Sequence, residues 1–269
     1  MTRPRLLDFA TQENYFSKVV ERNNAIQPSD NGLDDAFASL SLDGKSTQNP
    51  ASRTGGPKGR EPAESQVGQS IPMSNELSTV LMAMRKIREA IVASARTDGF
   101  ALHVYKFIIR ATILLNHMES YHPALLHLLH KLHPVVPLAK SEFQEFLGYY
   151  ILDLACRQDG LSEAYRAKCQ FRYSDARVEA VLKALAHGNW CVFWMLQKVV
   201  TIHQRSLMEK AEDRIRTQAL KCIAKSYLSV DKQYLEKSMQ RPWEKIEGRD
   251  GMGWQLDGDV VTIKRVKKK

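Results

Sequence analysis

Four histidines between residues 122 and 133 are the only cluster in the sequence with metal-site chemistry. His127 and His130 stand three residues apart, a spacing at which two imidazoles on one helix can share a metal ion. No Cys, Asp or Glu at ligand spacing completes the set, and Glu119 precedes the break at Pro123. We interpret the histidines as polar-face residues of a leucine-rich helix; a metal-dependent enzyme built on that helix is the alternative.

Other catalytic signatures are missing from the sequence. It contains no glycine-rich dinucleotide or phosphate loop, no nucleophile elbow and no paired-histidine zinc motif. The aromatic run of Trp190, Phe193 and Trp194 could stack on bases, but its helical spacing beside Val192 and Leu196 favours a core position. We therefore expect a protein that is not an enzyme and has no cofactor.

Basic side chains in the C-terminal third indicate contact with phosphate instead. The candidates are Arg205, Lys210, Arg214, Lys221, Lys225, Lys264, Arg265, Lys267, Lys268 and Lys269. Four of them recur at spacings of four and seven residues from Lys210 to Lys225, which predicts one stripe on a long helix. Acidic residues lie between these basic residues. The alternative interpretation is therefore a solvent-exposed helix face on which the charges form i,i+4 ion pairs. The terminal run fits a nuclear-import signal, a nucleic-acid anchor or a plain chain end.

The charge balance agrees with an anionic partner. The chain has a formal net charge of +9, and residues 76–229 hold 21 Lys and Arg against 14 Asp and Glu. That excess in the folded part favours nucleic acid or an acidic protein segment as a ligand, although many soluble proteins are equally basic.

The cysteines and apolar runs indicate the compartment. Four isolated cysteines in apolar helical patterns (Cys156, Cys169, Cys191 and Cys222) are expected to be buried, reduced thiols. The N-terminus lacks the apolar core of a signal peptide, and the longest apolar runs are too short to cross a bilayer. We expect a soluble, intracellular protein that does not associate with membranes.

The N-terminal quarter divides into a short helix and a polar tail. Apolar residues recur at helical spacing over residues 6–24, and residues 27–72 are rich in Gly, Pro and Ser. We expect residues 1–73 to be largely disordered apart from that helix. An acidic-apolar island at residues 33–42 is either a docking motif or a weakly helical stretch.

From Ser74 onward the pattern is helical. Helix-capping and helix-breaking residues predict helices over 74–99, 100–120, 123–132, 141–157, 161–171 and 174–187. A further helix is expected from Asn189, and a long one within 205–227. Gly188 is expected in the left-handed conformation, with Asn189 as the next N-cap. The helix–turn–helix rhythm of 74–228 is typical of a TPR-like helical-hairpin solenoid.

The pattern changes after Tyr227. Residues 230–239 predict a short helix, residues 243–246 lead into a glycine-rich turn, and residues 254–263 alternate around Asp257-Gly258 as a β-hairpin does. Two helices followed by a terminal hairpin predict a winged helix over 229–264, with a basic tail at 265–269. The predicted fold is thus mostly α, a solenoid ending in a winged helix.

These residues carry a resemblance to a known family. Residues 184–194, ALAHGNWCVFW, resemble the A-L-x-x-G-N-aromatic-x-x-F-F stretch of the GANP/Nin family of PCI domains. Residues 214–227 are similar to its R-x-x-A-L-x-x-h-x-x-S-Y helix, residues 145–152 to its E-F-x-A-Y-x-I-L helix, and residues 258–263 to its winged-helix hairpin. The similarity covers about residues 80–263, but the motif that precedes the helical domain in larger export scaffolds is not recognisable.

The resemblance implies a non-catalytic scaffold subunit. The expected role is GANP-like, in transcription-coupled mRNA processing or nuclear export, with a nuclear location. Expected partners are another PCI-type subunit, a small acidic disordered protein, and RNA or DNA. Residues of the winged helix expected to contact a protein partner are Tyr234, Trp243, Trp254, Val260 and Ile263. A cytoplasmic proteasome-lid, COP9 signalosome or translation-initiation subunit is the alternative within the same group.

Overall fold

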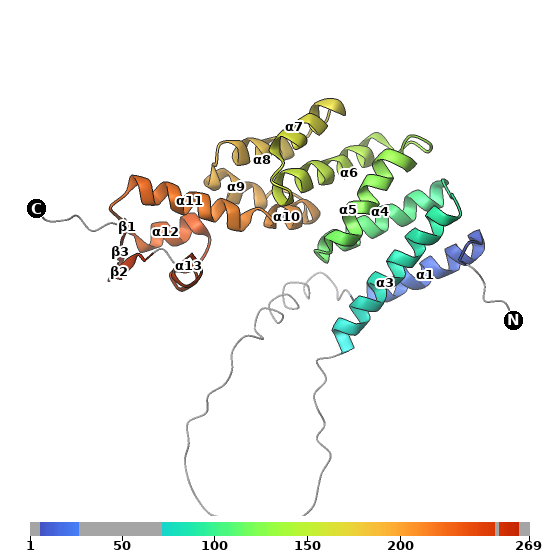
Figure 1. Cartoon of the computed structure of the whole chain (residues 1–269), viewed down its shortest axis with the longest axis horizontal. Coiled ribbons are helices and arrows are strands. Elements are labelled where there is room, and N and C mark those ends of the chain that lie inside the picture. The colour runs from blue at the N-terminus through green and yellow to red at the C-terminus, as the bar shows by residue number, and fades with distance from the viewer. Residues whose placement is uncertain (1–5, 27–71, 251–252, 264–269) are drawn as a thin grey trace, which may run out of the picture. The chain divides into compact units, whose positions relative to one another are not determined.

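The computed structural model describes residues 6–26, 72–250 and 253–263, with side chains at 72–75 and 248–250 excluded (Figure 1). The described part is mostly helical and contains one three-stranded sheet. It divides into two compact units, Met1–Arg96 and Thr97–Lys269. Most of the tail that was expected to be disordered lies outside the described residues, and so does the whole island at residues 33–42. Both expectations stay predictions.

The first unit is a pair of helices, α1 (Phe9–Ile26) and α3 (Pro72–Ala93). Its buried apolar residues include Phe16 and Val19 of α1 and Ile87 of α3. A buried arginine, Arg96, joins the two helices: it donates to the Phe9 carbonyl at 3.3 Å and to a carboxylate oxygen of Glu13 at 2.6 Å. Segments more than eighty positions apart in the chain are thereby held together.

The second unit begins with helices that pack mainly against their chain neighbours (Figure 1). They are α4 (Gly99–Leu114), α5 (Met118–His127), α6 (Lys140–Leu152), α7 (Leu161–Gln170), α8 (Ala176–Ala186), α9 (Trp190–Gln197), α10 (Ile202–Glu209) and α11 (Glu212–Ser226). Two π-helical turns, η1 (Leu128–Leu132) and η2 (Asp153–Arg157), extend α5 and α6. Helix α10 departs most from this neighbour packing: it contacts α4, α6 and η2.

Local signals set several boundaries. Asn189 accepts a hydrogen bond from the Val192 amide at 3.1 Å, and Gly188 has a φ of 62°, which confirms the predicted cap and turn. Phe193 and Trp194 are buried and Trp190 is half-buried, as a core position requires.

Several expected helices were wrong in detail. The helices expected over 74–99 and 100–120 end at Ala93 and Leu114. Helix α5 begins a turn before Pro123, where the amides of Ser120 and Tyr121 donate to the His117 carbonyl. The helix expected over 174–187 begins at Ala176 as α8, with Asp175 as its N-cap. The long helix within 205–227 is two helices, because the chain turns at Lys210 and Ala211 and buries Ala211 completely.

The cysteine prediction also needs correction. Cys156 is buried, and burial raises the pKa of its thiol to about 12. Cys169, Cys191 and Cys222 are exposed free thiols. Each occupies the outer side of its helix, although its sequence neighbours are apolar.

The chain after α11 forms a small module at the C-terminal end of the second unit (Figure 1). Its elements are β1 (Ser229–Asp231), α12 (Lys232–Met239), α13 (Trp243–Asp250), β2 (Gln255–Asp257) and β3 (Val260–Thr262). The sheet is antiparallel in the order β1-β3-β2, with Val261 opposite both Val230 and Leu256. Gly258 has a φ of 60° in the hairpin turn, as predicted, whereas β1 was not predicted.

Helix α11 carries the core of this module. Its residues Ala219, Leu220 and Ile223 form one buried cluster with residues from every other element of the module except β2. Those residues are Val230, Leu235, Met239, Trp243, Ile246, Trp254 and Val261. The module therefore closes over one face of the last helix of the array, and the opposite face of α11 is left to solvent or to a ligand.

Candidate nucleic-acid interface

Helix α11 separates its apolar and polar residues cleanly. Ile215, Ala219 and Ile223 recur at four-residue spacing and are buried. Gln218, Lys221 and Lys225 recur at three and four residues on another face and are exposed. The helix thus presents a polar row that begins near the α10–α11 turn and ends at the module.

The first turn of α11 holds charges that neutralise each other. Arg216 is buried under the sheet-bearing module and donates to Glu212 at 2.6 Å, to Asp213 at 3.3 Å and to the Met239 carbonyl at 3.0 Å. Its guanidinium also lies 4.9 Å from the centroid of the Trp194 ring. Arg216 is therefore a structural cation that is not offered to a ligand.

Arg214 is likewise committed to the fold. It donates to the carbonyls of Ala155 at 2.9 Å and Cys156 at 3.4 Å, and pairs with Asp159 at 3.1 Å. Both carbonyls belong to the π-turn η2 at the end of a helix, where backbone oxygens lack intrahelical partners. Arg214 ties α11 to η2, so only part of its charge reaches the surface.

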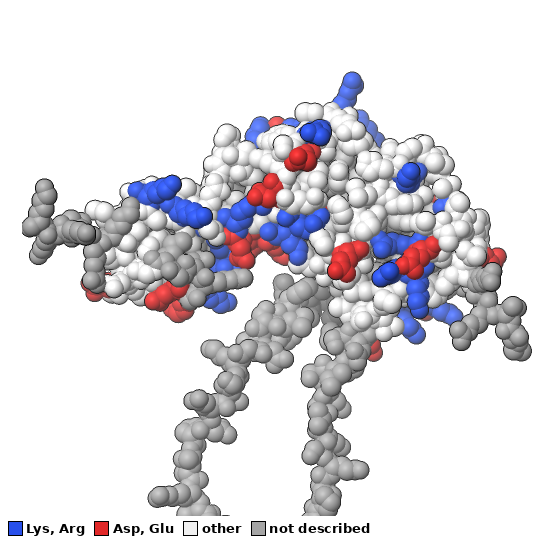
Figure 2. Space-filling view, viewed as in Figure 1, with Lys and Arg blue, Asp and Glu red and all other residues white. Residues whose placement is uncertain are grey.

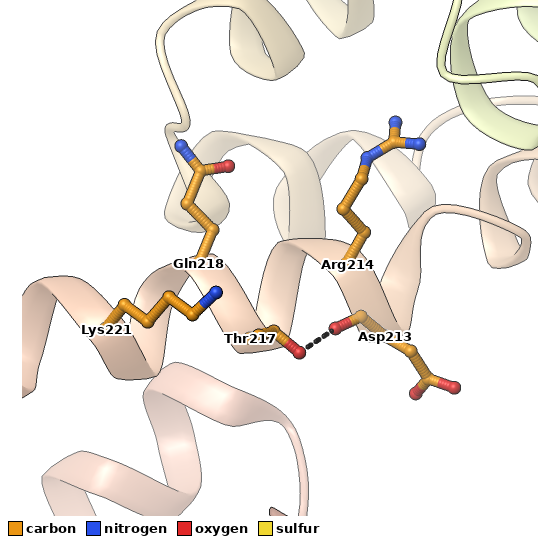
Figure 3. A pocket seen from close by; sticks show the side chains of 5 residues that line it. All are labelled: Asp213, Arg214, Thr217, Gln218 and Lys221. Carbon is orange, nitrogen blue, oxygen red and sulfur yellow. Dashed lines mark hydrogen bonds between the residues drawn. The ribbon is translucent and has the colours of Figure 1, made fainter.

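A shallow depression of about 420 Å³ lies along the same row, lined by Asp213, Arg214, Thr217, Gln218 and Lys221 (Figure 3). The Thr217 hydroxyl donates to the Asp213 carbonyl at 2.8 Å and is therefore not a free donor. Gln218 fills the space in front of Gly188, where an added Cβ would collide with its amide. Lys221 and Lys225 form no ion pair with any described residue, which leaves their ammonium groups for an external anion.

Of the candidate cations, the structure brings three into one row: Arg214, Lys221 and Lys225. Arg205 and Lys210 belong to α10 and to the turn after it, so the predicted single stripe is divided. In Figure 2 basic side chains follow the line of α10 and α11, with acidic side chains directly beside them. Lys264, Arg265, Lys267, Lys268 and Lys269 lie outside the described residues.

The expected partner-binding residues divide by exposure. Tyr234 and Val260 are exposed and Ile263 is half-buried. Trp243 and Trp254 lie in the core that joins the module to α11, where both rings serve packing.

The histidines of the leucine-rich helix are engaged in packing. His127 stacks on Tyr105 with ring centroids 4.7 Å apart, and His133 stacks on Phe143 at 4.3 Å. His130 packs edge-on against Tyr150 at 6.4 Å. Among the described residues, no group of three or more His, Cys, Asp or Glu side chains is placed to hold a metal ion.

A buried carboxylate, Asp153, was not singled out from the sequence. It accepts hydrogen bonds from Tyr121 at 2.7 Å, from Arg157 at 2.6 Å and from Gln158 at 3.0 Å, and lies 3.1 Å from His122. Burial by itself raises the pKa of Asp153, but these hydrogen bonds outweigh it and hold the pKa below its ordinary value. The available signal was an aspartate inside the apolar run of residues 151–156.

Comparisons with known proteins add no assignment. No protein-family model matches the chain, and a search of curated proteins finds no match. In the described part of the chain, no helix has the length and apolarity to cross a membrane.

Proposed function

We propose that this protein is a non-catalytic scaffold subunit of a multiprotein complex, of the GANP-like branch of PCI-domain proteins. Its role would lie in transcription-coupled mRNA processing or nuclear export. In this proposal the helices α4 to α11 act as a TPR-like solenoid, and β1, α12, α13, β2 and β3 act as its winged helix. The partners are a second PCI-type subunit and a small acidic protein, in the nucleus, and RNA is a further ligand.

The observation that supports this proposal is the double use of α11. One face of the helix forms the core of the C-terminal module, and another presents Lys221 and Lys225. Two hydrogen bonds reinforce the joint: Trp194 donates to the Ser238 carbonyl at 3.0 Å, and Arg216 donates to the Met239 carbonyl. A ligand that spans the helices and the module would meet a surface of fixed geometry, which suits a scaffold.

The chain path brings Ile263 next to the end of α11, and the basic tail of residues 264–269 follows Ile263 in the sequence. The amide of Ile263 donates to the Leu228 carbonyl at 2.9 Å, two residues beyond the end of α11. We assign phosphate contact to Lys221, Lys225 and that tail together, and leave Arg214 and Arg216 to the fold.

The test is a salt titration of RNA binding by the full chain. A labelled single-stranded RNA is titrated with the wild type, with Lys221→Glu/Lys225→Glu, and with the control Lys131→Glu/Lys140→Glu, which reverses two exposed lysines elsewhere in the same unit. We expect the α11 variant to bind more weakly and to lose about 1.4 from the slope of log affinity against log salt, because two phosphate contacts disappear. Equal affinities and slopes for all three proteins would remove α11 from the interface.

A further inference from the structure

The loop of residues 133–138, which joins η1 to α6, is closed by a bond to an ionisable side chain. Two of its residues are prolines and carry no N–H. Three of its amides donate to carbonyls of η1 at 2.9 or 3.1 Å; they belong to His133, Val135 and Val136. The remaining amide, that of Leu138, donates to Nδ1 of the His133 ring at 3.1 Å. Every N–H of the loop is thus paired, and the last pair depends on one histidine.

The His133 ring is held in place by packing. It stacks on Phe143 of α6, with ring centroids 4.3 Å apart and planes inclined by 17°. Phe171 at the end of α7 packs against Phe143 in turn, with ring centroids 6.1 Å apart. Leu138 is buried, and buried backbone N–H groups almost always keep a hydrogen bond. Because Ala139, the N-cap position of α6, makes no side-chain hydrogen bond, the bond from Leu138 to His133 fixes the chain just before that helix.

This hydrogen bond defines the protonation state of His133. A backbone amide can only donate, so Nδ1 must be the acceptor. In a neutral imidazole one nitrogen carries the proton and the other accepts, which places the proton of His133 on Nε2. A second proton on Nδ1 would set two donors against each other. Burial favours the neutral form as well, because it lowers the pKa of His133 below the ordinary value of 6.5.

No acidic neighbour stabilises a charged His133. The charged or titratable residues on the elements around the ring are His130 and Lys131 of η1, Lys140, Glu142 and Glu145 of α6, and Lys168, Cys169 and Arg172 at the end of α7. Glu142 is already paired with Lys106 at 2.7 Å. Glu145 is already paired with Arg110 at 2.8 Å. Within the described part of the chain, no carboxylate lies within ion-pair distance of His133.

We infer that His133 is a protonation-controlled latch, which holds the loop of residues 133–138 closed as neutral imidazole and releases it as imidazolium. When Nδ1 takes up a proton, its hydrogen bond with the Leu138 amide breaks and the two groups separate. The loop displays Val135, which is 60% exposed, so opening changes the surface between η1 and α6. This inference goes beyond the scaffold proposal and does not depend on the RNA interface of α11.

The direction of the pH dependence follows from the lowered pKa of His133. The stabilisation by the latch is fully present above the ordinary value of 6.5 and is lost as the pH falls through the folded-state pKa. The latch is therefore closed at neutral pH and opens on acidification. Burial also lowers the pKa of His203 on α10, so global stability would report both histidines, and the test needs a local readout.

Two substitutions in the full chain separate the two ring nitrogens. His133→Asn keeps an acceptor oxygen close to the position of Nδ1 and does not titrate. His133→Gln places its amide near the position of Nε2 and leaves Leu138 without its acceptor. The control is His130→Asn, which replaces an exposed histidine of the same π-turn. Circular dichroism and thermal melting verify that each variant folds.

The readout is hydrogen exchange at the Leu138 amide, expressed as protection relative to the unfolded chain at the same pH. Between about pH 7.5 and about pH 5 we expect the protection to fall at least about tenfold in the wild type and in His130→Asn. His133→Asn should keep its protection at both values, and His133→Gln should lack it at both. A wild-type protection that ignores pH, or an equal fall in His133→Asn, would overturn the inference.

A second measurement needs no variant. Nuclear magnetic resonance of the imidazole nitrogens in the isotope-labelled wild type reports which nitrogen of His133 carries the proton. We expect Nδ1 to be unprotonated at neutral pH and to gain its proton over the same pH range in which the Leu138 amide loses protection. A proton on Nδ1 at neutral pH would refute the latch.

Discussion

The indole nitrogen of Trp194 donates a buried hydrogen bond of 3.0 Å to the backbone carbonyl of Ser238, forty-four residues further along the chain. This bond joins α9 of the helical array to α12 of the C-terminal module. Trp194 therefore connects the helical array to the C-terminal module.

Replacing this indole tests the joint. Trp194→Phe removes the donor and leaves the Ser238 carbonyl buried without it, which should lower the free energy of unfolding by about 1–3 kcal/mol. Trp194→Ala should lower the free energy of unfolding by about 3–5 kcal/mol, because removal of the ring also leaves a cavity. The matched control is Trp190→Phe, since the indole nitrogen of Trp190 is buried without a hydrogen-bond partner among the described residues. Urea unfolding that shows equal losses for the two Phe variants would contradict this assignment.

The turn between α8 and α9 depends on Gly188 for two separable reasons. Its φ of 62° strains any residue with a Cβ, by about 1–2 kcal/mol, and the Gln218 amide occupies the place of that Cβ. Gly258 has nearly the same φ of 60°, but nothing lies within 4 Å of the position that a Cβ would take there. Gly188→Ala should therefore destabilise more than Gly258→Ala, as measured by urea unfolding. Adding Gln218→Ser should recover the difference; identical losses in the two alanine variants would show that Gln218 is irrelevant.

Arg214 should behave as a structural residue. Arg214→Gln removes charged donors from the Ala155 and Cys156 carbonyls, and we expect it to lower the free energy of unfolding by about 1–3 kcal/mol. Lys221→Gln, on the same face but without an ion pair to a described residue, should stay within about 0.5 kcal/mol of the wild type. Chemical denaturation measures the free energy of unfolding of both variants. If Arg214→Gln leaves that free energy unchanged, Arg214 becomes a candidate phosphate contact again.

The buried carboxylate of Asp153 predicts an acid-sensitive stability. Its pKa in the folded protein lies below the ordinary value of 3.8, so its stabilising contribution is fully present above about pH 4 and is lost as the pH falls through the folded-state pKa. Asp153→Asn should cost about 2–4 kcal/mol at neutral pH, below the cost for a fully buried pair because Arg157 is partly exposed.

The check on Asp153 is urea unfolding across an acid series. The difference between wild type and Asp153→Asn should shrink as the pH drops below about 4, because the carboxyl then binds a proton more readily in the unfolded chain than in the folded protein. Tyr121→Phe, which removes one neutral donor, should show a smaller loss of about 1 kcal/mol at neutral pH. A wild-type advantage that is constant down to the lowest pH would argue against an ionised Asp153.

Features that depend on a few adjacent residues could be predicted from the sequence. The left-handed Gly188, the Asn189 cap and the turn at Gly258 follow from local backbone preferences, and the structure confirms each. The predominance of helix followed from a sustained period of apolar residues. These signals need no knowledge of the rest of the chain.

Features that depend on contacts between distant parts of the chain could not be predicted from the sequence. No breaker marks the turn at Ala211; it arises where α10 packs on α4 and α6 while α11 turns to the module. Strand β1 is only three residues long and exists because it pairs with β3. The separation of Lys221 and Lys225 from Arg214 and Arg216 depends on which carbonyls and carboxylates lie within reach, and spacing along a helix does not contain that information.

The most direct test of the scaffold proposal is purification of the tagged full chain from nuclear extract, followed by mass spectrometry and native sizing. We predict recovery of a stoichiometric complex with a second PCI-type subunit and a small acidic protein, weakened by Trp194→Ala because the C-terminal module loses its anchor. Recovery of the wild-type chain as a lone monomer would contradict the account.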